Sequence, residues 1–203
     1  MGFYSRFILP RLIDSACSQP PLTELRRQFV PQARGRVLEI GIGSGLNLPL
    51  YRDIETLTGL EPNPALTERA QARAKDLGLD VDVLAASAEN IPAQPNTFDS
   101  IVCTWTLCSV TAPARALSEM RRVLKPEGRL YFIEHGLAPE ESTQAWQRRL
   151  NPLWSVIGGG CQLDRNIPEL IRGAGLKALE LDKSFVPGPK FAAFMYRGIA
   201  ALA

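Results

Sequence analysis

A run of alternating glycines follows an apolar segment near residue 40. The residues of this run that could do chemistry are Glu39, Gly41, Gly43 and Gly45. Because glycine has no Cβ, the backbone can turn sharply there and a ligand can lie against the peptide planes. A dinucleotide-binding loop would place its third glycine at Leu46, and a phosphate-binding P-loop would continue into Gly-Lys-Ser/Thr. The spacing therefore indicates a ligand-binding loop that is neither a dinucleotide-binding loop nor a P-loop.

A second carboxylate, Glu61, ends the next apolar segment and is followed by Pro62. A carboxylate at the tip of a strand can accept hydrogen bonds from both hydroxyls of a ribose. The alternative is a surface glutamate beside a helix start, since Asn63 and Pro64 are residue types that begin helices. Because the glycine loop precedes it, we favour ribose binding by Glu61.

His135, the sole histidine, follows another apolar segment. An imidazole titrates near neutrality and can take a proton from an incoming nucleophile, which makes His135 the candidate catalytic base. The alternative is a histidine that hydrogen-bonds a lid or packs on a cofactor. Cys103 and Cys108 fit small buried hydrophobic residues better than substrate contacts.

Strand and helix patterns that position these residues alternate along the chain. Strands are predicted at Arg36–Ile40, Thr56–Leu60, Val81–Ala85, Ser100–Thr104, Arg129–Glu134, Ala178–Ser184 and Phe194–Gly198. Helices are predicted at Leu46–Arg52, Pro64–Leu77, Pro113–Leu124, Gln144–Ile157 and Ile167–Ala174, with two short ones between Ser5 and Gln28 broken at Pro20-Pro21. This alternation predicts an α/β fold, a doubly wound, mostly parallel seven-stranded sheet with helices on both faces. Ligands of such sheets bind over the carboxyl ends of the strands.

Composition narrows the classes of function. The 203 residues suit one domain, and a net charge of +2 does not favour nucleic acid as a partner. Paired arginines such as Arg26-Arg27 are interpreted as solvated helix faces. The four cysteines lack Cys-x-x-Cys spacing and no histidine cluster accompanies them, so no metal site is predicted. Free thiols and the lack of an apolar run long enough to span a membrane predict a cytoplasmic protein.

Together the motifs resemble those of class I S-adenosylmethionine (AdoMet) methyltransferases. Residues 39–45 match the first motif of that family, Glu/Asp-x-Gly-x-Gly-x-Gly. Residues 86–92 resemble its Gly-Asp-Ala-Glu-Asn-Leu-Pro segment, with Ser87 in place of the aspartate that reads the adenine edge. Residues 123–130 resemble its Leu-Lys-Pro-Gly-Gly turn, with Glu127 replacing the first glycine.

The resemblance implies AdoMet as the cofactor and a Rossmann-like fold. The cofactor-binding residues that it implies are Glu39, Gly41, Gly43, Gly45, Asn47, Glu61, Pro62, Ser87, Ala88, Thr104 and Trp105. The single domain, 1–203, is expected to divide into an N-terminal helical cap (1–30), a cofactor-binding half (31–135), a lid insertion (136–175) and a final strand pair (176–203).

Three segments, 102–110, 132–135 and 154–165, resemble one branch of the family, the methyltransferase-like proteins that methylate small alkyl thiols. This implies transfer to a small molecule, with a thiol as the favoured acceptor. The alternatives are an N- or O-methyltransferase of a small or lipid-like acceptor, a non-catalytic AdoMet-binding module and, less favoured, a nicotinamide-dependent oxidoreductase. The oligomeric state is left open by the sequence.

Overall fold

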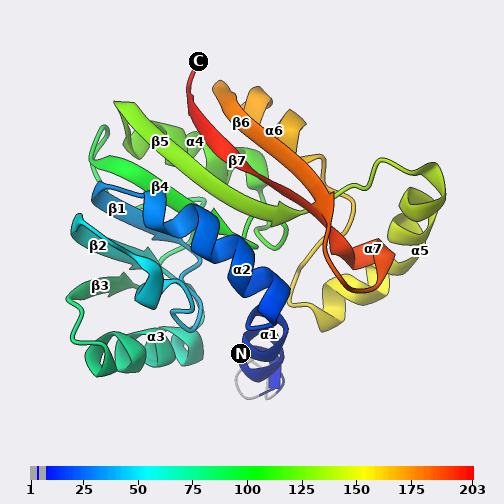
Figure 1. Ribbon diagram of the computed structural model, residues 1–203, viewed down its shortest axis with the longest axis horizontal. Helices are drawn as coiled ribbons and strands as arrows, with labels where there is room; N and C mark the ends of the chain where they lie inside the picture. The colour runs from blue at the N-terminus through cyan, green and yellow to red at the C-terminus, as the bar shows by residue number, and fades with distance from the viewer. Residues whose placement is uncertain (1–3, 5–7) are drawn as a thin grey trace.

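The computed structural model describes Tyr4 and residues 8–203, which form one twisted sheet covered by helices (Figure 1). Its seven strands are β1 (Gly35–Ile40), β2 (Ile54–Leu60), β3 (Val81–Leu84), β4 (Phe98–Thr104), β5 (Leu124–His135), β6 (Leu176–Phe185) and β7 (Phe194–Leu202). They are ordered β3-β2-β1-β4-β5-β7-β6, and β7 runs antiparallel to both its neighbours while the other pairs are parallel. The predicted fold class is confirmed.

Helices cover both faces of the sheet, with α2 on one side and α4 and α6 on the other (Figure 1). The helices are α1 (Leu9–Cys17), α2 (Pro20–Phe29), α3 (Pro64–Asp76), α4 (Pro113–Val123), α5 (Glu141–Ile157), α6 (Ile167–Gly173) and α7 (Lys190–Ala193), with short 3-10 turns η2 (Val30–Gln32) and η3 (Leu48–Leu50). None of these helices is long and apolar enough to cross a membrane.

Apolar residues on both faces of the central strands explain why β1 and β4 lie inside the sheet. Leu38 and Ile40 pack in one core cluster with Phe132, and Val37 packs in a second cluster with Tyr131. Burial on both faces is typical of parallel strands covered by helices. Ile40 is paired with Leu60 on one side and Cys103 on the other, so the ends of β1, β2 and β4 are level.

Two local predictions need correction. The helix predicted at Leu46–Arg52 is a 3-10 turn at Leu48–Leu50, because Pro49 has no N–H to donate and Tyr51 is extended. Within the described residues the two predicted N-terminal helices are α1, which ends at Cys17, and α2, which the prolines at 20 and 21 open; residues 5–7 of the predicted first helix lie outside the described residues. Proline suits that position, since the first N–H groups of a helix have no partner within it. The short helix α7 was not predicted.

Candidate functional site

A pocket of about 350 Å³ lies where β1, β2 and β4 end. The loops after β1, β2, β3 and β4 form its walls, and α1 covers it. Of the residues predicted to bind the cofactor, those that line this pocket are Glu39, Gly41, Gly43, Asn47, Glu61, Pro62, Ser87, Ala88, Thr104 and Trp105. Segments far apart in the sequence thus meet around one cavity.

The three glycines of the loop after β1 have different surroundings. A Cβ on Gly43 would meet nothing nearer than 3.9 Å, so this residue leaves open space in the pocket wall. A Cβ on Gly41 would lie 2.3 Å from Thr106 Oγ1, and one on Gly45 would lie 2.7 Å from Leu48 Cδ1. Gly45 does not line the pocket, and its lack of a side chain serves the packing of the loop.

Glu61 joins the end of β2 to the glycine loop. One carboxylate oxygen accepts the N–H of Gly43 at 3.2 Å, and the other accepts the N–H of Asn63 at 2.9 Å. Burial raises the pKa of Glu61, and the two backbone hydrogen bonds oppose that rise. The carboxylate therefore fixes the loop and faces the pocket with its remaining lone pairs.

Glu39 lies deeper, at the end of β1. Its carboxylate accepts hydrogen bonds from Asn47 Nδ2 at 2.8 Å and from the Tyr51 hydroxyl at 2.7 Å. Burial raises the pKa of Glu39 to about 7, although both hydrogen bonds act to lower it. Asn47 Oδ1 is buried and has no hydrogen-bond partner within the described chain. An unpaired acceptor in the wall of a pocket is suited to a ligand that donates a hydrogen bond.

Arg26 was interpreted from the sequence as part of a solvated face, and that interpretation is wrong. It is 4% exposed and lines the pocket, whereas its neighbour Arg27 is exposed. The guanidinium lies 4.4 Å from the centre of the Trp105 ring and donates to the Cys17 carbonyl at 2.6 Å. Its Nε has no partner in the described structure. A buried cation with a free donor is suited to a carboxylate.

The spacing of the apolar residues in α2 could have shown that Arg26 lies on the buried face of the helix. Leu22, Leu25 and Phe29 form the apolar stripe that packs against the sheet. Arg26 follows Leu22 by four positions, so it shares this buried face. An arginine within an apolar stripe is a better candidate for a ligand contact than one on a charged face.

Helix α1 closes the outer side of the pocket. Leu9, Ile13, Asp14 and Cys17 line the cavity, and the Ser44 hydroxyl donates to the Asp14 carboxylate. This hydrogen bond ties the covering helix to the glycine loop. Within the predicted lid insertion, 136–175, Gly159 reaches the pocket.

The loop after β4 supplies the opposite wall and is held by a buried acid. Glu134 is 0% exposed and accepts the N–H groups of Thr106 and Leu107, both at 2.9 Å, and of Cys108 at 3.3 Å. Trp105, at the start of the loop, has a φ of 50°, a backbone conformation that non-glycine residues adopt at some cost. Glu134 was missed from the sequence, although an acid within an apolar strand was a signal.

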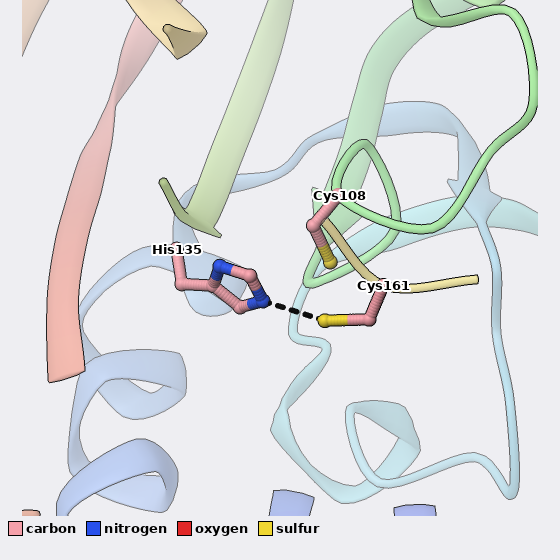
Figure 2. Close-up of side chains that lie close together, drawn as sticks. All are labelled: Cys108, His135 and Cys161. Atoms are coloured by element: carbon pink, nitrogen blue, oxygen red, sulfur yellow. Dashed lines mark hydrogen bonds between the residues drawn. The ribbon is translucent and has the colours of Figure 1, made fainter. Parts of the chain in front are cut away.

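His135, the predicted base, does not line the pocket. It is 8% exposed, and its Nε2 lies 2.8 Å from Cys161 Sγ (Figure 2). Trp154 Nε1 also donates to Cys161 Sγ, at 3.3 Å. A hydrogen bond with Cys108 and burial together raise the pKa of the Cys161 thiol. The imidazole and the two sulfur atoms therefore form a cluster of their own behind the pocket wall.

Residues 38–132 match the profile of a methyltransferase domain family. The chain is 35% identical over 150 residues to thiol S-methyltransferase TMT1B of Rattus norvegicus, a match that covers 72% of this chain and 62% of the rat protein. It is 33% identical over 126 residues to phosphatidylethanolamine N-methyltransferase of Cereibacter sphaeroides, covering 61% of this chain and 62% of that protein. The chain spans between 62% and 66% of the length of its thiol S-methyltransferase relatives.

The structural match to solved proteins covers more of this chain than the sequence matches do. The crystal structure of the [4+2]-cyclase SpnF superposes with a TM-score of 0.71 over 90% of this chain and 80% of that one, at 21% identity. A likeness at this identity concerns the fold alone. The sequence match and the strand order together place the chain in the methyltransferase domain family. The relatives of this chain in that family include thiol S-methyltransferases of rat, human and mouse.

Proposed function

We propose that the protein transfers the methyl group of AdoMet to a small-molecule acceptor. The observation that carries this proposal is the pocket at the ends of β1, β2 and β4, where the open space at Gly43 adjoins the Glu61 carboxylate. A backbone without side chains next to a ribose-binding acid suits an adenosine. The match to a methyltransferase domain supports the same reading.

The polar groups that remain free in the pocket fit the rest of AdoMet. Asn47 Oδ1 and the Glu39 carboxylate would accept from an ammonium group, and Arg26 Nε would donate to a carboxylate. When bound, the cofactor supplies a methyl group already activated by a positively charged sulfur. Ser87 and Ala88 line the pocket after β3, and we propose that they contact the adenine.

The raised pKa of Glu39 predicts pH-dependent binding. At low pH the buried Glu39 carboxyl is protonated, since its pKa is about 7. A cationic ligand favours the ionised form, so binding releases a proton and affinity rises with pH until Glu39 is ionised in the free protein. If only the ionised form binds, AdoMet affinity should rise about eightfold between about pH 6 and pH 7.5. Isothermal titration calorimetry in buffers of different ionisation enthalpy measures both the affinity and the proton release.

The matched variant for this prediction is Glu39→Gln, which keeps the shape of the side chain and removes its charge. Its AdoMet affinity should be lower and nearly independent of pH over the same range. An unchanged pH dependence in Glu39→Gln would assign the titration to another group of the pocket, such as Glu61.

For the acceptor, we propose a small alkyl thiol. The TMT1B likeness supports this class, and a thiol with a pKa near 8.5 needs little help to ionise. The sulfur of the thiolate forms a bond to the methyl carbon while the electron pair of the old bond returns to the cofactor sulfur. The proton of the thiol leaves to solvent before transfer. Because His135 does not line the pocket, we propose that it assists this step indirectly, through its contact with Cys161 at 2.8 Å. A lipid-like amine is the second candidate, because of the phosphatidylethanolamine N-methyltransferase likeness.

Transfer of a tritiated methyl group to a panel of thiols, amines and phenols tests the acceptor class. We expect product with thiols, and kcat/KM should rise with pH as thiolate forms. His135→Ala should lose more activity at neutral pH than at about pH 9, where the thiolate forms without help. Product with amines alone would contradict the thiol proposal. Calorimetry with AdoMet and with NAD separates a methyltransferase from an oxidoreductase. A cytoplasmic location stays a prediction.

A further inference from the structure

Cys108, His135 and Cys161 come together from three separate parts of the chain. Cys108 follows β4, His135 ends β5, and Cys161 follows α5. One sulfur or nitrogen atom from each lies within 4.8 Å of the other two. Figure 2 shows the Nε2 edge of the imidazole and both sulfur atoms facing the same space. The sequence had predicted no metal site because the cysteines lack Cys-x-x-Cys spacing and no histidine cluster accompanies them.

We propose that these three residues bind a zinc ion. Two thiolates and an imidazole are the ligand types that zinc prefers, and Cys₂His sets with a fourth open position occur in catalytic zinc sites. Zinc–ligand bonds of about 2.0–2.3 Å place tetrahedral ligand atoms about 3.6–3.8 Å apart. The observed separation of 2.8 Å between His135 Nε2 and Cys161 Sγ must open slightly, and the others lie within reach of this spacing.

The groups around the cluster are compatible with a cation. Binding releases two thiol protons to solvent, so two thiolates balance the charge of Zn²⁺. Trp154 Nε1 already donates to Cys161 Sγ, the kind of outer contact that orients a ligand. Arg165 is a cation near the cluster, and its guanidinium donates to the carbonyls of Leu107 and Val110.

A fourth position would connect the zinc to the acceptor. Ser109 and Gly159, close in sequence to Cys108 and Cys161, line the cofactor pocket, so the cluster borders that wall. A small thiol that loses its proton to solvent can occupy the open position as a zinc-bound thiolate. This step rests on the proposed thiol methylation. With zinc bound, His135 is a ligand, and the role in deprotonation proposed above belongs to the protein without metal.

Cobalt titration of the full chain tests the site without measuring activity. The protein is reduced with a phosphine, freed of metal and titrated with Co²⁺ and then with Zn²⁺. We expect one Co²⁺ per chain, with thiolate-to-cobalt absorption in the near ultraviolet and strong visible bands typical of four-coordinate cobalt. One equivalent of Zn²⁺ should remove these bands.

Serine variants locate the ligands. Cys108→Ser and Cys161→Ser should each weaken Co²⁺ binding by roughly 100-fold, since a hydroxyl replaces a thiolate. Cys103→Ser is the matched control, because Cys103 is also buried but its sulfur contacts Glu134. Thermal unfolding of each variant shows whether it is folded. Equal loss of Co²⁺ binding in the control would overturn the assignment.

Two further results would overturn the proposal. The first is a reduced wild-type protein that binds no stoichiometric Co²⁺ or Zn²⁺. The second is a disulfide between Cys108 and Cys161, detected by mass spectrometry, in protein that binds no metal after reduction.

Ethanethiol should shift the visible cobalt bands if the fourth position takes the acceptor, and unchanged bands would overturn that step. Metal binding without thiol methylation would contradict the proposed function alone, and thiol methylation by protein that binds no zinc would contradict the zinc site alone.

Discussion

Replacing Glu61 with alanine is expected to weaken AdoMet binding by about 10- to 100-fold, or about 1.5–3 kcal/mol. The change removes the proposed acceptor of two ribose hydrogen bonds. It also leaves the N–H groups of Gly43 and Asn63 without the carboxylate that now accepts them at 3.2 and 2.9 Å. Since Gly43 is the open part of the glycine loop, the loop should lose its fixed position as well. Calorimetry with AdoMet and with S-adenosylhomocysteine measures the loss.

Two other variants serve as controls for the Glu61→Ala result. Glu55→Ala removes an exposed glutamate from the opposite end of the same strand and should leave affinity unchanged. Glu61→Gln keeps one acceptor oxygen and should lose less affinity than Glu61→Ala, because the charge assists each hydrogen bond. If Glu61→Ala binds AdoMet as tightly as Glu55→Ala does, Glu61 is not a ribose ligand.

The parts of the fold that depend on the local pattern of apolar and turn residues could be predicted from the sequence. Apolar runs between turn residues located all seven strands to within a few residues, except that β5 begins earlier than expected, at Leu124. The alternation of strands and helices then determined the sheet class, and strand ends determined which residues meet. That is why Glu39, Glu61 and Trp105, distant in sequence, line one pocket.

The features that were missed depend on contacts between distant segments. Arg26 belongs to the site because α2 lies across the sheet with its apolar stripe inward, and paired arginines alone do not reveal which one is buried. The cluster of Cys108, His135 and Cys161 depends on where the chain after α5 returns to the sheet. Local spacing can find a Cys-x-x-Cys site but not a site assembled from three segments.

Removing the buried carboxylate of Glu134 is expected to have the largest effect on stability. Glu134→Ala should lower the free energy of unfolding by about 3–5 kcal/mol. The variant leaves the N–H groups of Thr106, Leu107 and Cys108 without their acceptor in a part of the structure that water does not reach. It also opens a cavity at the end of β5. Urea unfolding followed by circular dichroism measures the change.

The Glu134→Ala change should also shift the loop after β4, because the N–H groups that lose their acceptor belong to this loop, which forms a wall of the pocket. The folded fraction of Glu134→Ala should therefore bind AdoMet more weakly than the wild type does. Glu134→Gln keeps one carbonyl oxygen for the N–H groups but directs an amide N–H₂ at the others, so it should recover part of the stability. Glu127→Ala, at the exposed start of the same strand, is the matched control and should change the free energy of unfolding by less than about 0.5 kcal/mol. If Glu134→Ala is no less stable than Glu127→Ala, the loop is held by its own backbone and side-chain contacts, such as the hydrogen bond from the Thr106 hydroxyl to the Ile40 carbonyl at 3.0 Å.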